Sequence, residues 1–155
     1  MTGAWLGSTF RDLTSLRRNA RDLAAALPRL GAADPSTVML LARNSFLPLE
    51  VTMAVALAGA RVVPVSPHAT ATELDFLLRD SGARIAIGDA DLLEPMRDVL
   101  DGVVTIAQHT PGEVTDAYGI PADTRVVQPW CLDYDEVVLR GSTSRDIAAA
   151  GGGAV

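Results

Sequence analysis

The stretch from Asn44 to Gly82 constrains the fold of this chain most strongly, because it predicts a helix, a strand and a second helix in quick succession. Residues Leu49–Ala58 are apolar on nearly every side, which is typical of a buried helix. Gly59 predicts a left-handed stop for that helix. Arg61–Val65 predicts a strand with Pro64 near its end, where a missing N–H is tolerated. This order, with short links, indicates one repeating unit of a parallel α/β sheet.

The flanking segments extend this unit in both directions. Phe10–Leu27 carries apolar residues at helical spacing opposite an arginine-rich face, and therefore predicts an amphipathic helix. Short apolar runs predict three further buried strands, at Thr37–Ala42, Arg84–Gly88 and Val103–Ala107.

Two capping boxes predict where further helices begin. Thr70 and Glu73 form the first, and Asp91 and Glu94 form the second, which opens a helix running to about Leu100. Strands that alternate with helices imply right-handed crossovers. We therefore expect an α/β fold: a Rossmann-like three-layer domain with a mainly parallel sheet and helices on both faces.

The regular pattern weakens along the chain, which suggests three regions. Residues 1–107 are expected to form the α/β core, and residues 108–140 a loop-rich extension, because 109–123 is rich in Pro, Gly, Thr and Asp. Within the extension we predict a short edge strand at Arg125–Val127 and a short helix or extended segment over Leu132–Leu139. Residues 141–155 have neither an apolar face nor turn signals, so we expect a disordered tail.

Composition excludes several classes of function. The net charge of -6 argues against nucleic acid or an anionic membrane as a partner. All thirteen basic residues are arginine, so no side chain can form a Schiff base or serve as a phosphate-loop lysine. The longest apolar run, Val51–Ala60, is far shorter than the roughly 20 residues of a spanning helix. Met1–Phe10 lacks the pattern of a signal peptide. With Cys131 as its single cysteine, the chain is expected in the reducing cytoplasm.

The sequence offers few candidates for chemistry among its histidines and its cysteine. His68 precedes a helix and can polarise a substrate, but a solvent-facing loop position is the simpler interpretation. His109 is too far along the chain from it to indicate a zinc pattern. Cys131 can act as a nucleophile, yet it has no base nearby in the sequence, so a half-buried structural thiol is favoured.

Two polar clusters near the C-terminus are weaker candidates. Asp133, Asp135 and Glu136 can hold Mg²⁺ with a phosphate ligand, but a solvated acidic face is the preferred interpretation. The segment Gly141-Ser142-Thr143-Ser144 can bind an anion through backbone N–H groups, although it lacks a second glycine and a capping signal.

Two other classes of α/β protein are disfavoured by the residues after the first core strand. A dinucleotide-binding enzyme needs G-x-G-x-x-G there, and Arg43-Asn44-Ser45 are too bulky for a pyrophosphate to approach the backbone. A receiver-like regulator needs clustered acids at strand ends, where this chain has Ala42-Arg43-Asn44.

Several segments together resemble one enzyme family, the AMP-forming adenylating enzymes, which include acyl-CoA synthetases, adenylation domains of peptide synthetases and luciferases. The similar segments, in chain order, are Arg18–Leu27, Val38–Ser45, Ala54–Pro67, Glu73–Arg84 and Tyr134–Leu139. The resemblance covers residues 10–92 well and 130–141 loosely, and it places the chain at the N-terminal portion of such an enzyme.

The resemblance implies an AMP-dependent acyl-CoA synthetase, which activates a carboxylic acid with ATP to an acyl-adenylate and then forms a thioester with coenzyme A. The resemblance also implies ATP, Mg²⁺ and coenzyme A for the complete enzyme, and a role in fatty acid metabolism. No catalytic, cofactor-binding or metal residue is carried over to this chain, because the family's phosphate loop and catalytic lysine have no counterpart in it. We therefore expect the isolated chain to be inactive. Self-association or docking to a missing portion is expected, and the alternative is a non-catalytic interaction or scaffold module.

Overall fold

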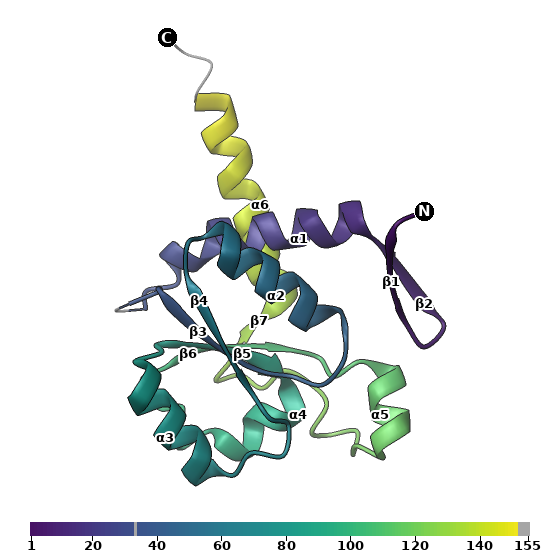
Figure 1. Cartoon of the computed structure of the whole chain (residues 1–155), viewed down its shortest axis with the longest axis vertical. Coiled ribbons are helices and arrows are strands. Elements are labelled where there is room, and N and C mark those ends of the chain that lie inside the picture. Colours follow the sequence, from purple (N-terminus) through teal and green to yellow (C-terminus); the bar gives the residue numbers. More distant parts are fainter. Residues whose placement is uncertain (33, 152–155) are drawn as a thin grey trace.

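Five parallel strands form the central sheet of the computed structural model, which describes residues 1–32 and 34–151 (Figure 1). The strands are β3 (Thr37–Leu41), β4 (Arg61–Val65), β5 (Ile85–Asp89), β6 (Val104–Gln108) and β7 (Leu132–Asp133). Their spatial order is β4-β3-β5-β6-β7, and every pairing is parallel. The predicted α/β class with a parallel sheet is confirmed.

Helices cover both faces of this sheet, so the molecule has three layers (Figure 1). On one face lie α1 (Leu13–Ala26), α2 (Phe46–Leu57) and the first part of α6 (Tyr134–Gly151), and on the other lie α3 (Ala71–Ser81) and α4 (Ala90–Leu93). Because side chains alternate along a strand, Val38 and Leu40 of β3 pack under the first group of helices. Met39 and Leu41 pack under the second.

Polar side chains and a glycine cap the ends of two helices. Ser45 caps α2, accepting a hydrogen bond from the N–H of Leu47 at 3.3 Å. Thr70 and Glu73 form the predicted capping box at the start of α3. Gly82 ends that helix with φ = 68°, a left-handed conformation that a side chain would strain.

The helix predicted from Asp91 to Leu100 is wrong in its start and its length. Here α4 ends at Leu93 and continues only as the short 3-10 helix η2 (Glu94–Met96). Pro95 has no N–H to continue the α-helical pattern, which accounts for the change. Asp91 is not the cap residue, because its carboxylate is bound by side chains outside the helix.

The loop-rich extension contains more regular structure than predicted. A short helix, α5 (Gly112–Tyr118), lies inside the predicted loop 109–123. Arg125–Val127 is not a strand, because it makes isolated hydrogen bonds instead of a ladder. The Arg125 carbonyl accepts the N–H of Thr110, and the Val127 N–H donates to the imidazole of His109. The edge strand is instead β7, which pairs with β6 through Leu132 and Asp133.

Helix α6 occupies most of the segment predicted as a disordered tail. It continues without interruption from Tyr134 to Gly151, so residues 141–151 are helical, while 152–155 lie outside the described residues. Its first turns are anchored by the buried side chains of Tyr134 and Val137. At Gly141 a Cβ would overlap the carbonyl oxygen of Asp22, so glycine permits α6 to cross α1 at close range.

A two-stranded antiparallel hairpin, which the sequence pattern does not indicate, precedes α1. It consists of β1 (Gly3–Leu6) and β2 (Thr9–Asp12), and the ring centroids of Trp5 and Phe10 lie 5.1 Å apart. Figure 1 shows this hairpin at the end of α1 farthest from β4.

The outer border of the sheet at β4 carries the proline of that strand. Arg61 donates its N–H toward β3, to the Ser36 carbonyl at 2.8 Å. Since successive residues of a strand direct their backbone groups to opposite sides, Val62 and Pro64 face away from β3. The missing N–H of Pro64 therefore breaks no bond within the sheet, as predicted.

Within the described part of the chain, no helix combines the length and the apolar character needed to cross a lipid bilayer.

Candidate functional site

The carboxyl ends of the central strands form the first candidate site. In open parallel sheets, ligands bind where neighbouring connections leave in opposite directions. Here β3 connects to β4 on one side, while β5 lies on its other side, so the reversal falls between β3 and β5. Polar residues follow both strands at this point: Arg43 after β3 and Asp89 at the end of β5.

Asp89 is the most buried polar group at this edge, with 0% of its surface exposed. Its carboxylate accepts the backbone N–H of Arg43 at 2.9 Å and the side-chain amide of Gln108 at 2.6 Å. Burial raises the pKa of the Asp89 carboxyl, and the two hydrogen bonds oppose that effect. The Gln108 amide also reaches the Ser45 hydroxyl at 3.3 Å. Asp89 therefore ties together the ends of β3, β5 and β6 and, through Gln108, the start of α2.

A second set of contacts lies at the same edge of the sheet. Arg43 forms an ion pair with Asp91 at 2.8 Å, and its guanidinium lies 5.1 Å from the ring centre of Tyr118 in α5. The Thr110 hydroxyl donates to Asp91 at 2.7 Å. Beside these groups is a hollow of about 170 Å³, lined by Ala42, Arg43, Asn44, Pro67, His68 and Tyr118.

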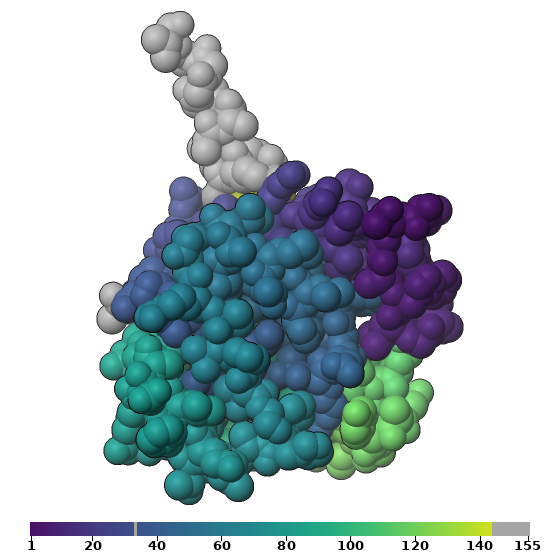
Figure 2. Space-filling model, viewed as in Figure 1, coloured from purple at the N-terminus to yellow at the C-terminus, as the bar shows by residue number. Residues whose placement is uncertain are grey.

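The β1–β2 hairpin borders a neighbouring hollow of about 300 Å³. Glu113 of α5 accepts hydrogen bonds from the Ser8 N–H, the Ser8 hydroxyl and the Thr9 hydroxyl, at 3.2, 3.0 and 2.9 Å. Figure 2 shows the purple hairpin resting against the green surface of α5. This hollow lies between the hairpin, the start of α2 and α5, and it is lined in part by Arg11 and Gln108.

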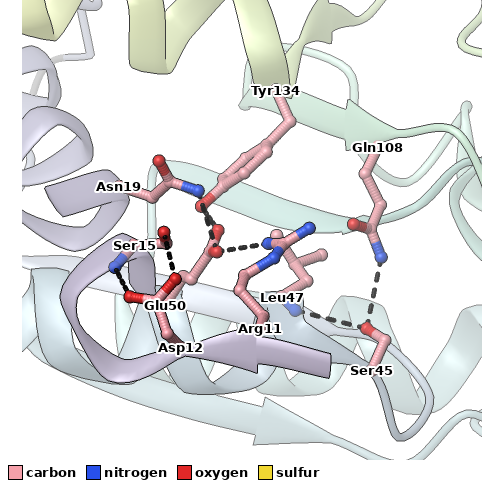
Figure 3. Close-up of polar contacts among 9 residues, drawn as sticks. All are labelled: Arg11, Asp12, Ser15, Asn19, Ser45, Leu47, Glu50, Gln108 and Tyr134. Carbon is pink, nitrogen blue, oxygen red and sulfur yellow. Dashed lines mark hydrogen bonds and ion pairs between the residues drawn. The ribbon is translucent and has the colours of Figure 1, made fainter. Parts of the chain in front are cut away.

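Behind this edge, a buried carboxylate joins four elements of the fold (Figure 3). Glu50 of α2 has 1% of its surface exposed and accepts hydrogen bonds from Arg11 in β2, Asn19 in α1 and Tyr134 in α6. The Tyr134 hydroxyl donates at 2.7 Å. Burial, and then the charge of Glu50, raise the pKa of Tyr134, so the phenol stays protonated and able to donate.

These two networks can hold backbone segments in fixed positions. The carboxylates of Glu50, Asp89 and Asp91 each have protein donors as partners. Within the described residues, no three or more His, Cys, Asp and Glu side chains are grouped to hold a metal ion.

The two histidines are placed apart by the sheet. His68 follows β4 and His109 follows β6, and both β3 and β5 lie between those strands. His68 is exposed and borders the 170 Å³ hollow. The imidazole of His109 accepts the N–H of Val127 at 3.2 Å and lies 3.3 Å from a carboxylate oxygen of Asp133.

The acidic cluster serves as a helix cap in the structure. Asp133 accepts the backbone N–H groups of Asp135 and Glu136 at 2.9 and 3.3 Å, at the start of α6. Carboxylates near a helix N-terminus also interact favourably with its dipole.

The weak candidate for an anion loop, Gly141–Ser144, does not form such a loop, because this segment is the interior of α6. Backbone N–H groups inside a helix are directed along its axis to carbonyl oxygens, so they do not converge on a ligand. The Thr143 hydroxyl donates back to the Leu139 carbonyl at 3.3 Å.

Cys131 lies beside Trp130, whose indole N–H donates to Glu94 at 2.7 Å. Burial raises the pKa of the Cys131 thiol to about 11, the negative charge of Glu94 adds to the effect, and Arg97 opposes it. The thiol is therefore protonated at neutral pH, which agrees with a structural thiol and not with a nucleophile.

Cys131 is expected to react slowly with iodoacetamide at pH 8. Because its pKa is raised from 9.0 to about 11, the thiolate fraction, and so the alkylation rate, falls about a hundredfold. The rate is measured by intact mass against the same chain unfolded in urea. Equal rates in the folded and unfolded chains would contradict the assignment.

Sequence reasoning missed Glu50, Asp89 and Gln108. Each is a lone polar residue within or at the end of an apolar run, and that signal was available. Their partners are not visible in the sequence, since Tyr134 lies 84 positions from Glu50.

A family model described as AMP-binding enzyme matches residues 8–143. A long-chain-fatty-acid–CoA ligase from Mycobacterium tuberculosis is 32% identical over 111 residues, which is 72% of this chain and 20% of that protein. A 2-succinylbenzoate–CoA ligase from Geobacillus kaustophilus is 34% identical over 86 residues, 56% of this chain and 18% of that protein.

Solved structures share the fold at low identity. An anthranilate CoA ligase in complex with anthranoyl-AMP superposes with a TM-score of 0.69 at 19% identity, covering 90% of this chain and 25% of that one. A benzoate CoA ligase from Burkholderia xenovorans gives 0.65 at 20% identity, covering 88% and 25%. The chain thus spans about a fifth to a quarter of the length of these proteins.

Proposed function

Because the chain belongs to the AMP-binding enzyme family, we propose that it forms the N-terminal part of an AMP-dependent acyl-CoA synthetase. Such an enzyme activates a carboxylic acid with ATP to an acyl-adenylate and then transfers the acyl group to coenzyme A. The observation that carries the proposal is the family match over residues 8–143, which contains all five strands of the parallel sheet. The two ligases with over 30% identity support the same class of reaction.

The role proposed for this chain is that of a structural part of the enzyme that does not itself bind the phosphates of ATP. Binding the phosphates of ATP requires converging backbone N–H donors and a cation. The sequence contains no lysine, and residues 141–143 belong to the body of α6. The described residues therefore do not fit the phosphate groups of ATP, and we assign phosphate binding, Mg²⁺ and coenzyme A to other polypeptide of the complete enzyme.

The substrate is proposed to be a carboxylic acid, without narrower assignment. The relatives are named for acids as different as long-chain fatty acids and 2-succinylbenzoate. We further propose that this chain docks to the remaining polypeptide of the enzyme in the cytoplasm, where its single cysteine stays reduced.

The isolated chain is expected to give no ATP–pyrophosphate exchange with a panel of aromatic and fatty acids. Exchange should appear when the chain is mixed with a polypeptide that supplies the remaining four-fifths of a related ligase. A misfolding variant of this chain in the same mixture controls for activity of the added polypeptide alone. Robust exchange by the chain alone would contradict this structural role, and no exchange in the mixture would contradict the proposed function.

The alternative of a non-catalytic interaction or scaffold module is not favoured. The relatives that match this chain include two CoA ligases and a tripeptide synthetase, and these names describe enzymes.

A further inference from the structure

A shallow apolar groove runs along the outer surface between α1 and α2, which lie side by side (Figure 1). It has a volume of about 270 Å³ and is lined by Arg17, Ala20, Arg21, Met53, Ala56 and Leu57. The side chain of Leu57 is 60% exposed. One turn before Met53 on α2, Leu49 is also exposed, and it extends the apolar surface along the helix.

The rim of this groove is positively charged on a protein of net charge -6. Arg17 and Arg21 are exposed and lie one turn apart on α1. Neither guanidinium has an ion-pair partner among the residues that the structure describes. An exposed arginine pair beside apolar side chains is therefore left without a counter-charge.

The carboxylates of the two helices do not reach this surface. Helix α1 contains one acidic residue, Asp22, and α2 contains one, Glu50. Both are buried, with 3% and 1% of their surface exposed. The outer face of α1 and α2 thus presents arginine and apolar groups without acidic ones, in contrast to the composition of the whole chain.

We propose that this groove docks an acidic amphipathic helix of a separate partner protein. Leucine-like side chains of that helix would lie over Met53, Ala56 and Leu57, as in other helix-in-groove complexes. Glutamate or aspartate side chains along its edge would pair with Arg17 and Arg21. The complementary charge selects the acidic helix over a basic one.

The test uses a fluorescent peptide of about 18 residues, long enough to populate a helix, with leucines on one face and glutamates beside them. Binding to the whole chain is measured by anisotropy. The Arg17→Glu/Arg21→Glu double variant is expected to bind about tenfold more weakly, because two attractive pairs become repulsive. Raising the salt concentration should weaken binding of the unmodified chain.

Arg18→Glu is the matched control. Arg18 is exposed on the same helix but does not line the groove, and its replacement changes the net charge by as much as each single substitution of the double variant. It is expected to change the affinity less than about twofold. Circular dichroism should be unchanged for all variants, because the three arginines are exposed.

Three outcomes would overturn the proposal. The first is equal binding of a scrambled peptide of the same composition. The second is a loss with Arg18→Glu as large as that of the double variant. The third is binding to phosphatidylglycerol vesicles that depends on Arg17 and Arg21, with none to the peptide, since the groove would then face a lipid surface.

Discussion

Gly88→Ala is expected to destabilise the fold by about 3 kcal/mol or more. The added Cβ would overlap the carbonyl oxygen of Leu41 and lie 3.0 Å from its carbonyl carbon. Both atoms belong to the backbone of β3, which pairs with β5 at this position, so they cannot move without breaking the ladder. A domain of this size is stable by only about 5–15 kcal/mol, so the melting temperature should fall by roughly 10 °C.

Gly112→Ala provides the control for Gly88→Ala. Gly112 is the first residue of α5, its φ is not positive, and a Cβ there would meet no atom within 4 Å. Alanine is favoured over glycine in a helix by up to about 1 kcal/mol, so this variant should melt at or slightly above the temperature of the unmodified chain. Thermal melts followed by circular dichroism compare the two. A Gly88→Ala variant with the same melting temperature as Gly112→Ala would refute the close approach of β3 and β5.

Glu50→Ala is expected to lower the free energy of unfolding by about 3 kcal/mol or more. The substitution removes the shared acceptor of Arg11, Asn19 and Tyr134 and leaves a cavity under α1 and α6. The loss should come mainly from Tyr134, which is 4% exposed, because Arg11 is partly exposed and can be solvated.

Tyr134→Phe separates the hydrogen bond from the packing. It keeps the buried ring and removes only the hydroxyl that donates to Glu50, so a smaller loss of about 1–2 kcal/mol is expected. Urea unfolding of both variants gives the two free energies. In the double variant the losses should not add, because both remove the same bond. Full additivity would show that Tyr134 and Glu50 do not interact.

The core elements could be predicted because their signals are local. The apolar strand Thr37–Leu41 and the capping box of Thr70 and Glu73 each carry their own pattern within a few residues. The family resemblance rests on the same segments, and the comparisons confirm it. Such elements persist in the structure because local preference and tertiary packing agree.

The elements that were missed depend on partners distant in sequence. The hairpin is held by Glu113, more than a hundred residues away, and β7 consists of two residues that pair with β6. The contacts of Asp89 were missed for the same reason. Asp89 stands out as a carboxylate after an apolar strand, but Gln108 and Arg43 become its partners only when the strands are placed side by side.

The orientation of Pro64 determines where this sheet can acquire a new neighbour. A strand added along the outer side of β4 would find a single backbone N–H donor, that of Val62. The N–H groups of Arg61, Val63 and Val65 are directed toward β3, and Pro64 has no N–H. Molecules of this chain are thereby hindered from polymerising edge to edge through β4. The opposite margin, at β7, has no proline, so it is the less obstructed edge for β-structure contributed by further polypeptide.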